Sequence, residues 1–174
     1  GSTLISTIDI ELQEYGEQLM QNKIGAIVAI EPSSGEILSL VSAPTYNPNL
    51  LIGRKRSENY NILSQDKNKP LFNRALQGTY PPGSTFKLII GLIALQEGAI
   101  RKSTSFTCNG DDGYYFGQDK YVGCHPHQNP LNLIEGIEIS CNAYFCNTYE
   151  KYFNRFNSTI EAYDNWYSHV SSFG

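Results

Sequence analysis

The sequence has no long run of basic residues and no apolar segment long enough to span a bilayer. Its 13 Lys and Arg residues are outnumbered by 17 Asp and Glu, which gives a formal net charge of −4. The nearest approach to a basic cluster, Arg54-Lys55-Arg56, is too short to follow a phosphate backbone. The longest apolar run, Leu88–Leu95, is interrupted by Gly91 and falls well short of the ~20 residues of a membrane helix. These absences argue against nucleic acid as a partner and against a membrane span within the chain.

Cysteine is also scarce, and it is unevenly placed. The four cysteines, Cys108, Cys124, Cys141 and Cys146, all lie in the second half of the 174 residues. Four are too few for a disulfide framework, but their crowding indicates a local site. The chain further lacks an initiator Met and a signal-like segment, and Gly1-Ser2 is typical of a tag remnant. We therefore expect a piece of a larger protein.

What is present predicts a globular domain of the α+β class. A hydrophobic content of 40% and an aromatic content of 12% exclude a disordered chain. Hydrophobic spacing predicts helices over residues 8–20, 84–98, 131–139 and 143–156. Two β-branched runs, at residues 25–32 and 36–41, predict a β-hairpin around the turn Ser33-Ser34-Gly35. Residues 44–71 are expected to form a long irregular connection, and no element is predicted after residue 156.

The segment Ser84-Thr85-Phe86-Lys87 places a serine and a lysine three residues apart at the start of a predicted helix. Residues at this spacing share one helix face, so the Lys87 amine can lie beside the Ser84 hydroxyl and activate it as a nucleophile. The pattern alone is not specific, because Ser64-Gln65-Asp66-Lys67 and the Ser-x-Asn segment Ser57-Glu58-Asn59 occur in polar chain. The plainer interpretation is that Ser84 caps the helix and Lys87 is solvated.

A longer segment favours the catalytic interpretation. Residues 73–87, NRALQGTYPPGSTFK, closely resemble the active-site segment of penicillin-binding protein transpeptidase domains. Thr7-Ile8-Asp9, the hairpin Ala26–Val41 and the segment Ser42–Asn49 resemble the same family in the same order. The resemblance runs from about residue 6 to about residue 150, and it is greatest to the monofunctional (class B) enzymes of cell elongation.

This resemblance implies a peptidoglycan D,D-transpeptidase. Ser84 would attack the penultimate D-Ala carbonyl of a stem peptide, Lys87 would take its proton, and an amine from a second stem peptide would complete the cross-link. Ser140 and Asn142 match the family's Ser-x-Asn motif, with Ser140 as proton shuttle and Asn142 bonded to the substrate amide and Lys87. A helix cap before Ala143 is compatible with that role. β-Lactam antibiotics would acylate Ser84, and catalysis would need no cofactor.

The resemblance also sets expectations about what surrounds the chain. The family's third motif, Lys-Thr/Ser-Gly, is absent, because Lys102-Ser103-Thr104 lacks the glycine and precedes Ser140. We therefore expect residues 1–174 to be the N-terminal portion of a penicillin-binding/β-lactamase-like transpeptidase fold, comprising its helical part and the first sheet hairpin. The full-length protein would be held by a membrane anchor at the periplasmic face of the bacterial inner membrane and would work with a glycosyltransferase partner.

A cysteine–histidine cluster is predicted independently of these motifs. Five potential ligands lie in this stretch, Cys108, Cys124, His125, His127 and Cys141, and structural zinc prefers four N/S ligands. Some elongation-type relatives are similar in carrying a zinc site here, with Asp, Asp, His and Cys ligands. This resemblance implies Cys108, Cys124, His127 and Cys141 as the ligands, so that Cys replaces both Asp in this chain. A Cys108–Cys124 disulfide and plain buried thiols are the alternatives. His125 is a reserve ligand, Cys146 is expected in the core, and His169 at the surface.

Three other functions stay open from the sequence. A β-lactam-sensing receptor has the same acylated serine and lysine, and a serine β-lactamase has a similar N-terminal half of the domain. The Pro-Pro-Gly segment directly before Ser84 and the long connection at residues 44–71 favour the transpeptidase. The third is a small zinc-binding interaction module, which would make the Ser84 match accidental.

Overall fold

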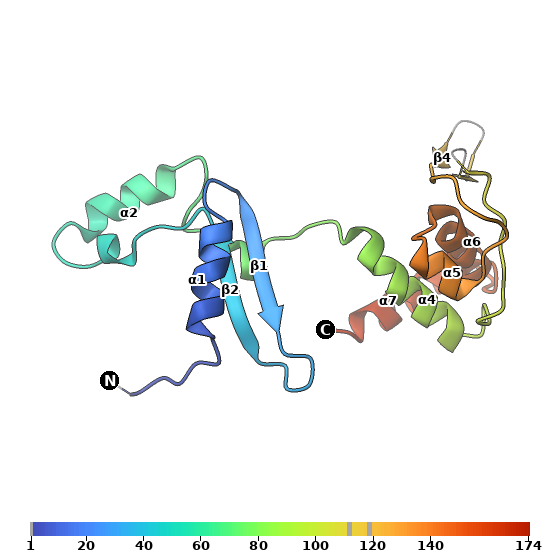
Figure 1. Ribbon diagram of the computed structural model, residues 1–174, viewed down its shortest axis with the longest axis horizontal. Coiled ribbons are helices and arrows are strands. Elements are labelled where there is room, and N and C mark those ends of the chain that lie inside the picture. The colour runs from blue at the N-terminus through green and yellow to red at the C-terminus, as the bar shows by residue number, and fades with distance from the viewer. Residues whose placement is uncertain (1, 111–112, 118–119) are drawn as a thin grey trace. The chain divides into compact units, whose positions relative to one another are not determined.

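The computed structural model describes residues 2–110, 113–117 and 120–174 and divides the chain into two compact units, one ending at Tyr80 and the other beginning at Pro81. Each unit is described separately (Figure 1). In the part of the chain that is described, no helix combines the length and apolar character that crossing a membrane requires.

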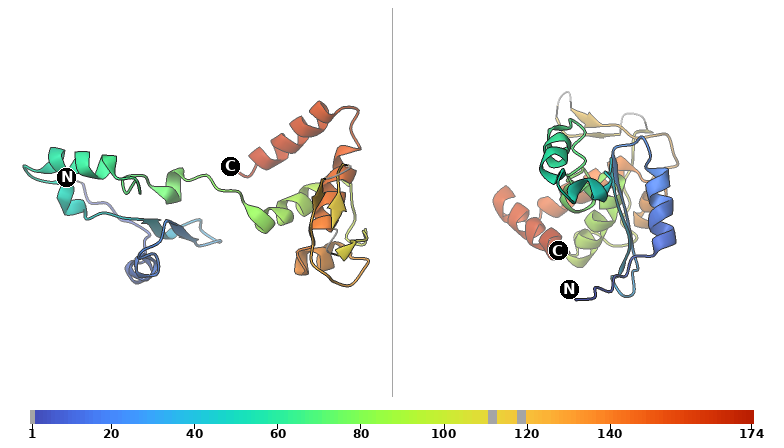
Figure 2. Two further views of the ribbon diagram at one scale, coloured as in Figure 1. Left: turned by 90° about the horizontal axis from the view of Figure 1, so that it is seen from above. Right: turned by 90° about the vertical axis from the view of Figure 1, so that its left-hand side faces the viewer.

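The first unit is built on the predicted hairpin. Strands β1 (Gly25–Ile30) and β2 (Ile37–Ala43) pair antiparallel, and helix α1 (Ile10–Leu19) lies against one face of the pair, as the right-hand view of Figure 2 shows. Asp9 caps α1 by accepting a hydrogen bond from the Leu12 amide, at 3.0 Å. A Cβ at Gly16 would come within 2.9 Å of Val41, so the helix approaches the sheet closely because this residue has no side chain.

The prediction of an irregular connection over residues 44–71 was wrong in part. A 3-10 turn, η1 (Pro48–Leu51), is followed by helix α2 (Arg56–Gln65), and the short helix α3 (Arg74–Gln77) comes later. Ser57 and Ser64, which begin the two further matches to the short serine motifs, therefore lie in helix α2 rather than in irregular chain. Helix α2 buries none of its residues, so it has no apolar face from which a helical period could be read.

The second unit is mainly helical. The turn η2 (Gly83–Thr85) leads into α4 (Phe86–Gln96), and α4 contacts α5 (Leu133–Glu138), α6 (Asn142–Phe153) and α7 (Thr159–Ser171). Two short strands, β3 (Tyr114–Tyr115) and β4 (Tyr121–Val122), form a second hairpin. The largest fully buried side chains here include Tyr144, Tyr152, Ile93 and Leu131.

Helix α7 was not predicted, and its aromatic contacts explain why it forms. Ser158 caps it through the Glu161 amide, and Trp166 is buried with edge-on ring contacts to Tyr149 and Tyr152. The sequence does carry a signal for this helix: Ala162, Trp166 and Val170 recur at helical spacing, and Ser158 is followed three residues later by Glu161. His169 was expected at the surface, but it is half-buried and pairs with Glu97 of the α4 C-cap at 2.7 Å.

Substitution of Leu131 tests how much the core of the second unit contributes to the stability of the fold. Its side chain is fully buried and its backbone pairs with Phe106. We expect Leu131→Ala to lower the free energy of unfolding by about 2–5 kcal/mol, because the substitution leaves a cavity that the neighbours fill only in part. Ile134→Ala, at a nearby side chain that is 58% exposed, is the matched control and should cost less than about 1 kcal/mol. Denaturant unfolding of both variants measures the difference, and equal losses would contradict this account of the core.

Candidate active site and thiol cluster

Ser84 lies at the start of the α4 segment, as predicted. It is the middle residue of η2, one residue after Gly83, whose φ of 60° is a left-handed conformation that glycine adopts at little cost. The N-cap position of α4 is Thr85, without a side-chain capping bond, and the Thr85 hydroxyl donates to the Pro82 carbonyl instead. The plainer interpretation of Ser84 as the cap of this helix is therefore wrong, and its exposed hydroxyl is left available at the mouth of a cavity.

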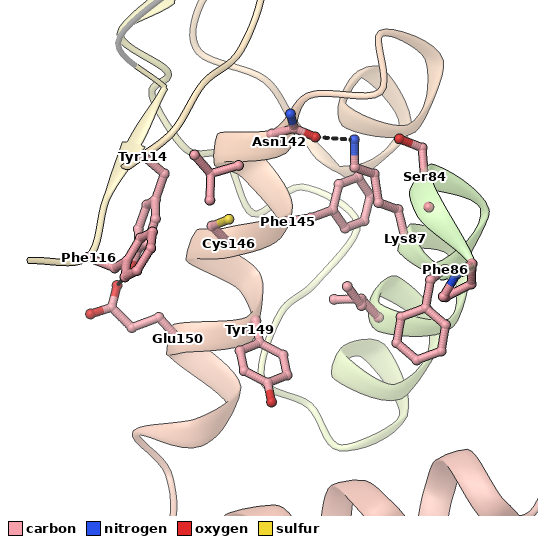
Figure 3. Close-up of a pocket in the computed structure, with 14 residues that line it drawn as sticks. Ser84, Phe86, Lys87, Tyr114, Phe116, Asn142, Phe145, Cys146, Tyr149 and Glu150 are labelled. Carbon is pink, nitrogen blue, oxygen red and sulfur yellow. Dashed lines mark hydrogen bonds between the residues drawn. The ribbon is translucent and has the colours of Figure 1, made fainter. Parts of the chain in front are cut away.

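Lys87 follows one turn later and donates three hydrogen bonds. Its Nζ is 2.6 Å from the Ser140 carbonyl oxygen, 3.0 Å from Ser140 Oγ and 2.6 Å from Asn142 Oδ1. Figure 3 shows the Ser84 hydroxyl pointing toward the same ammonium. Lys87 is thus hydrogen-bonded to both Ser140 and Asn142, and Ser84, the fourth predicted residue, lies one turn before Lys87 at the helix start. The solvated position considered for Lys87 is not observed.

Ser140 and Asn142 are brought to Lys87 by a sharp change of chain direction between α5 and α6. Ser140 has a φ of 58°, an unfavourable value for a residue with a side chain, and Asn142 is the first residue of α6. The cap of α6 is Cys141, whose sulfur accepts from the Tyr144 amide at 3.3 Å, so the capping role considered for Ser140 and Asn142 belongs to the residue between them. The Asn142 amide also donates to the Gly123 carbonyl at 2.8 Å.

An apolar cavity of about 620 Å³ opens beside these residues. Ser84, Lys87 and Asn142 lie at one end, while Phe86 and Phe145 line its side (Figure 3). The other end of the cavity was not predicted: there the Tyr114 hydroxyl donates to Glu150 at 2.8 Å. No signal in the sequence links two residues that are 36 positions apart. Cys146 was expected in the core, but it is half-buried and lines this cavity.

The charge of Lys87 is affected by its surroundings. Burial lowers the pKa of Lys87 below its ordinary value, although the thiols of Cys124, Cys141 and Cys146 act in the opposite direction. The ammonium also lies 5.9 Å from the centre of the Phe145 ring. A lysine whose amine is more easily deprotonated than usual is suited to accept a proton from a neighbouring hydroxyl.

The predicted cysteine–histidine cluster converges on one point. The ligand atoms of Cys108, Cys124, His127 and Cys141 all lie within 4.8 Å of one another. Cys124 Sγ is 3.7 Å from Cys141 Sγ and 3.7 Å from His127 Nε2. All four cysteines are free thiols, so the alternative Cys108–Cys124 disulfide is not formed in this structure, and neither Cys146 nor His125 belongs to the cluster.

Chemistry and geometry both fit a tetrahedral zinc site. Zinc–sulfur bonds of about 2.3 Å and zinc–nitrogen bonds of about 2.0–2.1 Å imply ligand separations of roughly 3.6–3.8 Å, which the distances around Cys124 match. His127 Nδ1 is 2.7 Å from the Gln128 carbonyl, which can only accept, so Nδ1 carries the proton and Nε2 keeps a free lone pair toward Cys124. Burial opposes ionisation of Cys124, but hydrogen bonding to its sulfur, chiefly from the backbone amide of Asn142, lowers its pKa to about 6.

Comparison with known proteins gives one family. The family model for the penicillin binding protein transpeptidase domain matches residues 25–171. The peptidoglycan D,D-transpeptidase MrdA of Escherichia coli K12 is 42% identical over 151 residues, which are 83% of this chain and 23% of MrdA. The peptidoglycan D,D-transpeptidase PbpA of Mycolicibacterium smegmatis is 44% identical over 115 residues, covering 62% of this chain and 23% of PbpA. The chain thus spans about a quarter of these relatives.

Solved structures agree on the fold. Pseudomonas aeruginosa PBP2 in complex with WCK 5153 aligns with a TM-score of 0.76 and 32% identity, over 97% of this chain and 36% of that chain. The penicillin G acyl-enzyme complex of penicillin-binding protein A from Mycobacterium tuberculosis aligns with a TM-score of 0.76 and 29% identity, over 97% and 39%. The predicted α+β fold class is confirmed, and the chain belongs to the penicillin-binding protein transpeptidase family.

Proposed function

We propose that this chain carries the nucleophilic half of a peptidoglycan D,D-transpeptidase that acts in cell elongation. The observation that supports this most strongly is the Lys87 ammonium held by Ser140 and Asn142 beside the Ser84 hydroxyl. The names of the MrdA and PbpA relatives supply the reaction class. Residues 1–174 would then be the N-terminal portion of the transpeptidase domain, and the third motif would come from further chain.

Lys87 is the proposed general base. A neutral amine has two N–H donors, and the Ser140 carbonyl and Asn142 Oδ1 can only accept, so these two oxygens hold both donors. The amine lone pair is then left for a hydroxyl, either that of Ser84 or that of Ser140. Removal of the Ser84 proton gives an alkoxide at the start of α4, where backbone N–H groups favour negative charge.

The acyl transfer follows from these positions. Ser84 Oγ forms a bond to the penultimate D-Ala carbonyl carbon, and the bond from that carbon to the terminal D-Ala nitrogen breaks. The proton taken by Lys87 passes through the Ser140 hydroxyl, 3.0 Å away, to the leaving amine. Asn142 would hold the substrate amide. The amine nitrogen of a second stem peptide then bonds to the ester carbonyl carbon, the bond from that carbon to Ser84 Oγ breaks, and a proton released by the amine returns to Ser84.

Covalent labelling tests this function. A polypeptide that extends the chain through a third motif should form one adduct with a fluorescent penicillin, on Ser84, and should join two stem peptides with release of D-Ala. The deacylation rate separates the alternatives: fast hydrolysis indicates a β-lactamase, and a stable adduct without cross-linking indicates a receptor. In the family the third motif supplies one of the two oxyanion-hole N–H donors. We therefore expect the 174 residues alone to acylate slowly, because losing one such donor costs about 10²–10³-fold in rate.

A structural zinc ion is the proposed occupant of the thiol cluster. The donor set, the 3.7 Å separations and the His127 tautomer support it. When bound, zinc would supply a tetrahedral cross-link between the loop containing Cys108, the segment from Cys124 to His127 and the α6 cap Cys141. It would take no part in the acyl transfer.

The cellular setting is a further proposal. The MrdA relatives support a role in cell-wall synthesis, and we propose a membrane-anchored protein at the periplasmic face of the inner membrane. Its partners would be peptidoglycan stem peptides, β-lactam antibiotics and a glycosyltransferase.

The pH dependence of acylation tests the role of Lys87. Lys87 must be neutral to act as a base, so the acylation rate should rise with pH through the pKa of this group. Because burial lowers that pKa, we expect the midpoint to lie below the ordinary lysine value of about 10.4. Rates of penicillin acylation across this range measure it, with Lys67→Ala as a control that keeps the same profile. A flat profile, or a midpoint at the ordinary value, would contradict the assignment.

A further inference from the structure

Cys141 joins the thiol cluster to the lysine site through the backbone. It is one of the four cluster residues, and it stands between Ser140 and Asn142, which provide all three acceptors of Lys87. The Ser140 carbonyl belongs to the planar peptide group that joins Ser140 to Cys141, so a displacement of Cys141 moves this acceptor of Lys87. Its sulfur also caps α6, so the cluster fixes the first turn of the helix that carries Asn142.

A second connection runs through Cys124. The Asn142 amide donates to the carbonyl of Gly123, the residue before Cys124, while Asn142 Oδ1 accepts from Lys87. The sulfurs of Cys124 and Cys141 are 3.7 Å apart. Asn142 is therefore bonded to Cys141 through the backbone and to the residue before Cys124 through its side chain.

Ser140 shows why such support is needed. Its left-handed backbone, with a φ of 58°, is unfavourable for a residue with a side chain and persists only where the surrounding structure holds it. In this conformation, both the carbonyl oxygen and Oγ of Ser140 accept hydrogen bonds from Lys87. A loosened loop would relax toward ordinary backbone angles and withdraw these acceptors.

We propose that Cys124 and Cys141, cross-linked by one metal ion, are positioning residues for Lys87. This proposal rests on the proposed zinc site, and it adds that the bound metal holds the hydrogen-bond acceptors of Lys87 in place. The metal state of the cluster then sets the hydrogen bonding of the lysine, although no cluster atom takes part in the reaction.

Lysine side-chain NMR on the 174-residue chain tests the proposal without relying on activity. The Lys87 Nζ signal is identified by its loss in Lys87→Arg and compared in the zinc-loaded, cadmium-loaded and metal-free reduced chain. We expect it to shift and to lose protection from hydrogen exchange on metal removal, while Lys23, which bonds to Leu19 in the other unit, stays unchanged. Because the metal-free chain can unfold, the comparison of the two loaded forms is decisive: the larger cadmium ion separates the sulfurs, and the Lys87 signal should differ.

Acylation kinetics provide a second test of the link between the metal and Lys87. In the extended polypeptide, held at a temperature where Trp166 fluorescence shows it folded, metal removal should lower the first-order acylation step about 10–100-fold. Zinc should restore the rate. Bound metal with no response of Lys87 overturns this inference and leaves the zinc site standing, whereas failure to bind metal under reducing conditions overturns both.

Discussion

Replacing Ser84 by alanine is expected to abolish covalent labelling by β-lactams. The alanine keeps the η2 turn but removes the only atom that can form the ester, and Lys87 then has no substrate hydroxyl to deprotonate. Loss of a serine nucleophile costs on the order of 10⁶-fold in rate in comparable enzymes, which is below detection in a gel or mass assay. The measurement is adduct formation with a fluorescent penicillin in the extended polypeptide.

The chain provides a matched control for this experiment. Ser64 has a lysine three residues later, yet it lies in α2, and its hydroxyl donates to the Asn61 carbonyl at 2.9 Å. Ser64→Ala should therefore label at the same rate as the unaltered protein. Persistent labelling of Ser84→Ala, or loss of labelling in Ser64→Ala, would show that the nucleophile has been misplaced.

Stripping the metal from the cluster is expected to destabilise the second unit strongly. Cys108, Cys124 and Cys141 are far apart in sequence, so the bound state ties together segments that are independent in the unfolded chain. At a free zinc concentration 1,000-fold above the dissociation constant, binding stabilises the fold by about 4 kcal/mol. For a unit of this size, removal should lower Tm by roughly 15–30 °C. Calorimetry with and without a chelator, beside elemental analysis, measures the change.

Two controls separate zinc from the disulfide alternative. Cys146→Ser changes a thiol outside the cluster and should leave the metal content at about one ion per chain. A mass about 2 Da below that of the reduced chain, with Cys108 and Cys124 linked, would favour the disulfide. Unchanged Tm on chelation would contradict a structural role for the metal.

Local features of the sequence were sufficient for much of the fold. The hairpin follows from β-branched runs around Ser33-Ser34-Gly35, and α1 follows from its spacing and its Asp9 cap. The helix that begins near Ser84 follows from the Pro-Pro-Gly segment and the apolar run behind it. Each of these depends on residues within a few positions of one another, where turn chemistry and helix period act directly.

Helix α2 could not be predicted in this way, whereas the spacing of Ala162, Trp166 and Val170 and the Ser158 cap are local signals for α7 that its Tyr/Ser-rich composition obscured. Helix α2 has no buried face, and α7 gains its stability from Trp166 against the aromatic residues of α6 rather than from its own propensity. The composition of the tail was visible in the sequence, but the surface that it covers was not.

Patterns in the amino-acid sequence were enough to identify the residue types at the site: a serine and a lysine on one helix face, a Ser-x-Asn segment, and a cluster of N/S ligands. How these residues meet depends on the packing of elements that are distant in the chain. Lys87 finds its acceptors 53 and 55 positions away, one of them a backbone carbonyl, which is present at every residue and therefore leaves no mark in a sequence. The same holds for the Gly123 carbonyl that orients Asn142. Spacing along a chain constrains contacts within one helix or turn, whereas contacts between elements depend on how buried surfaces pack. In this protein, that packing places the thiol cluster beside Lys87.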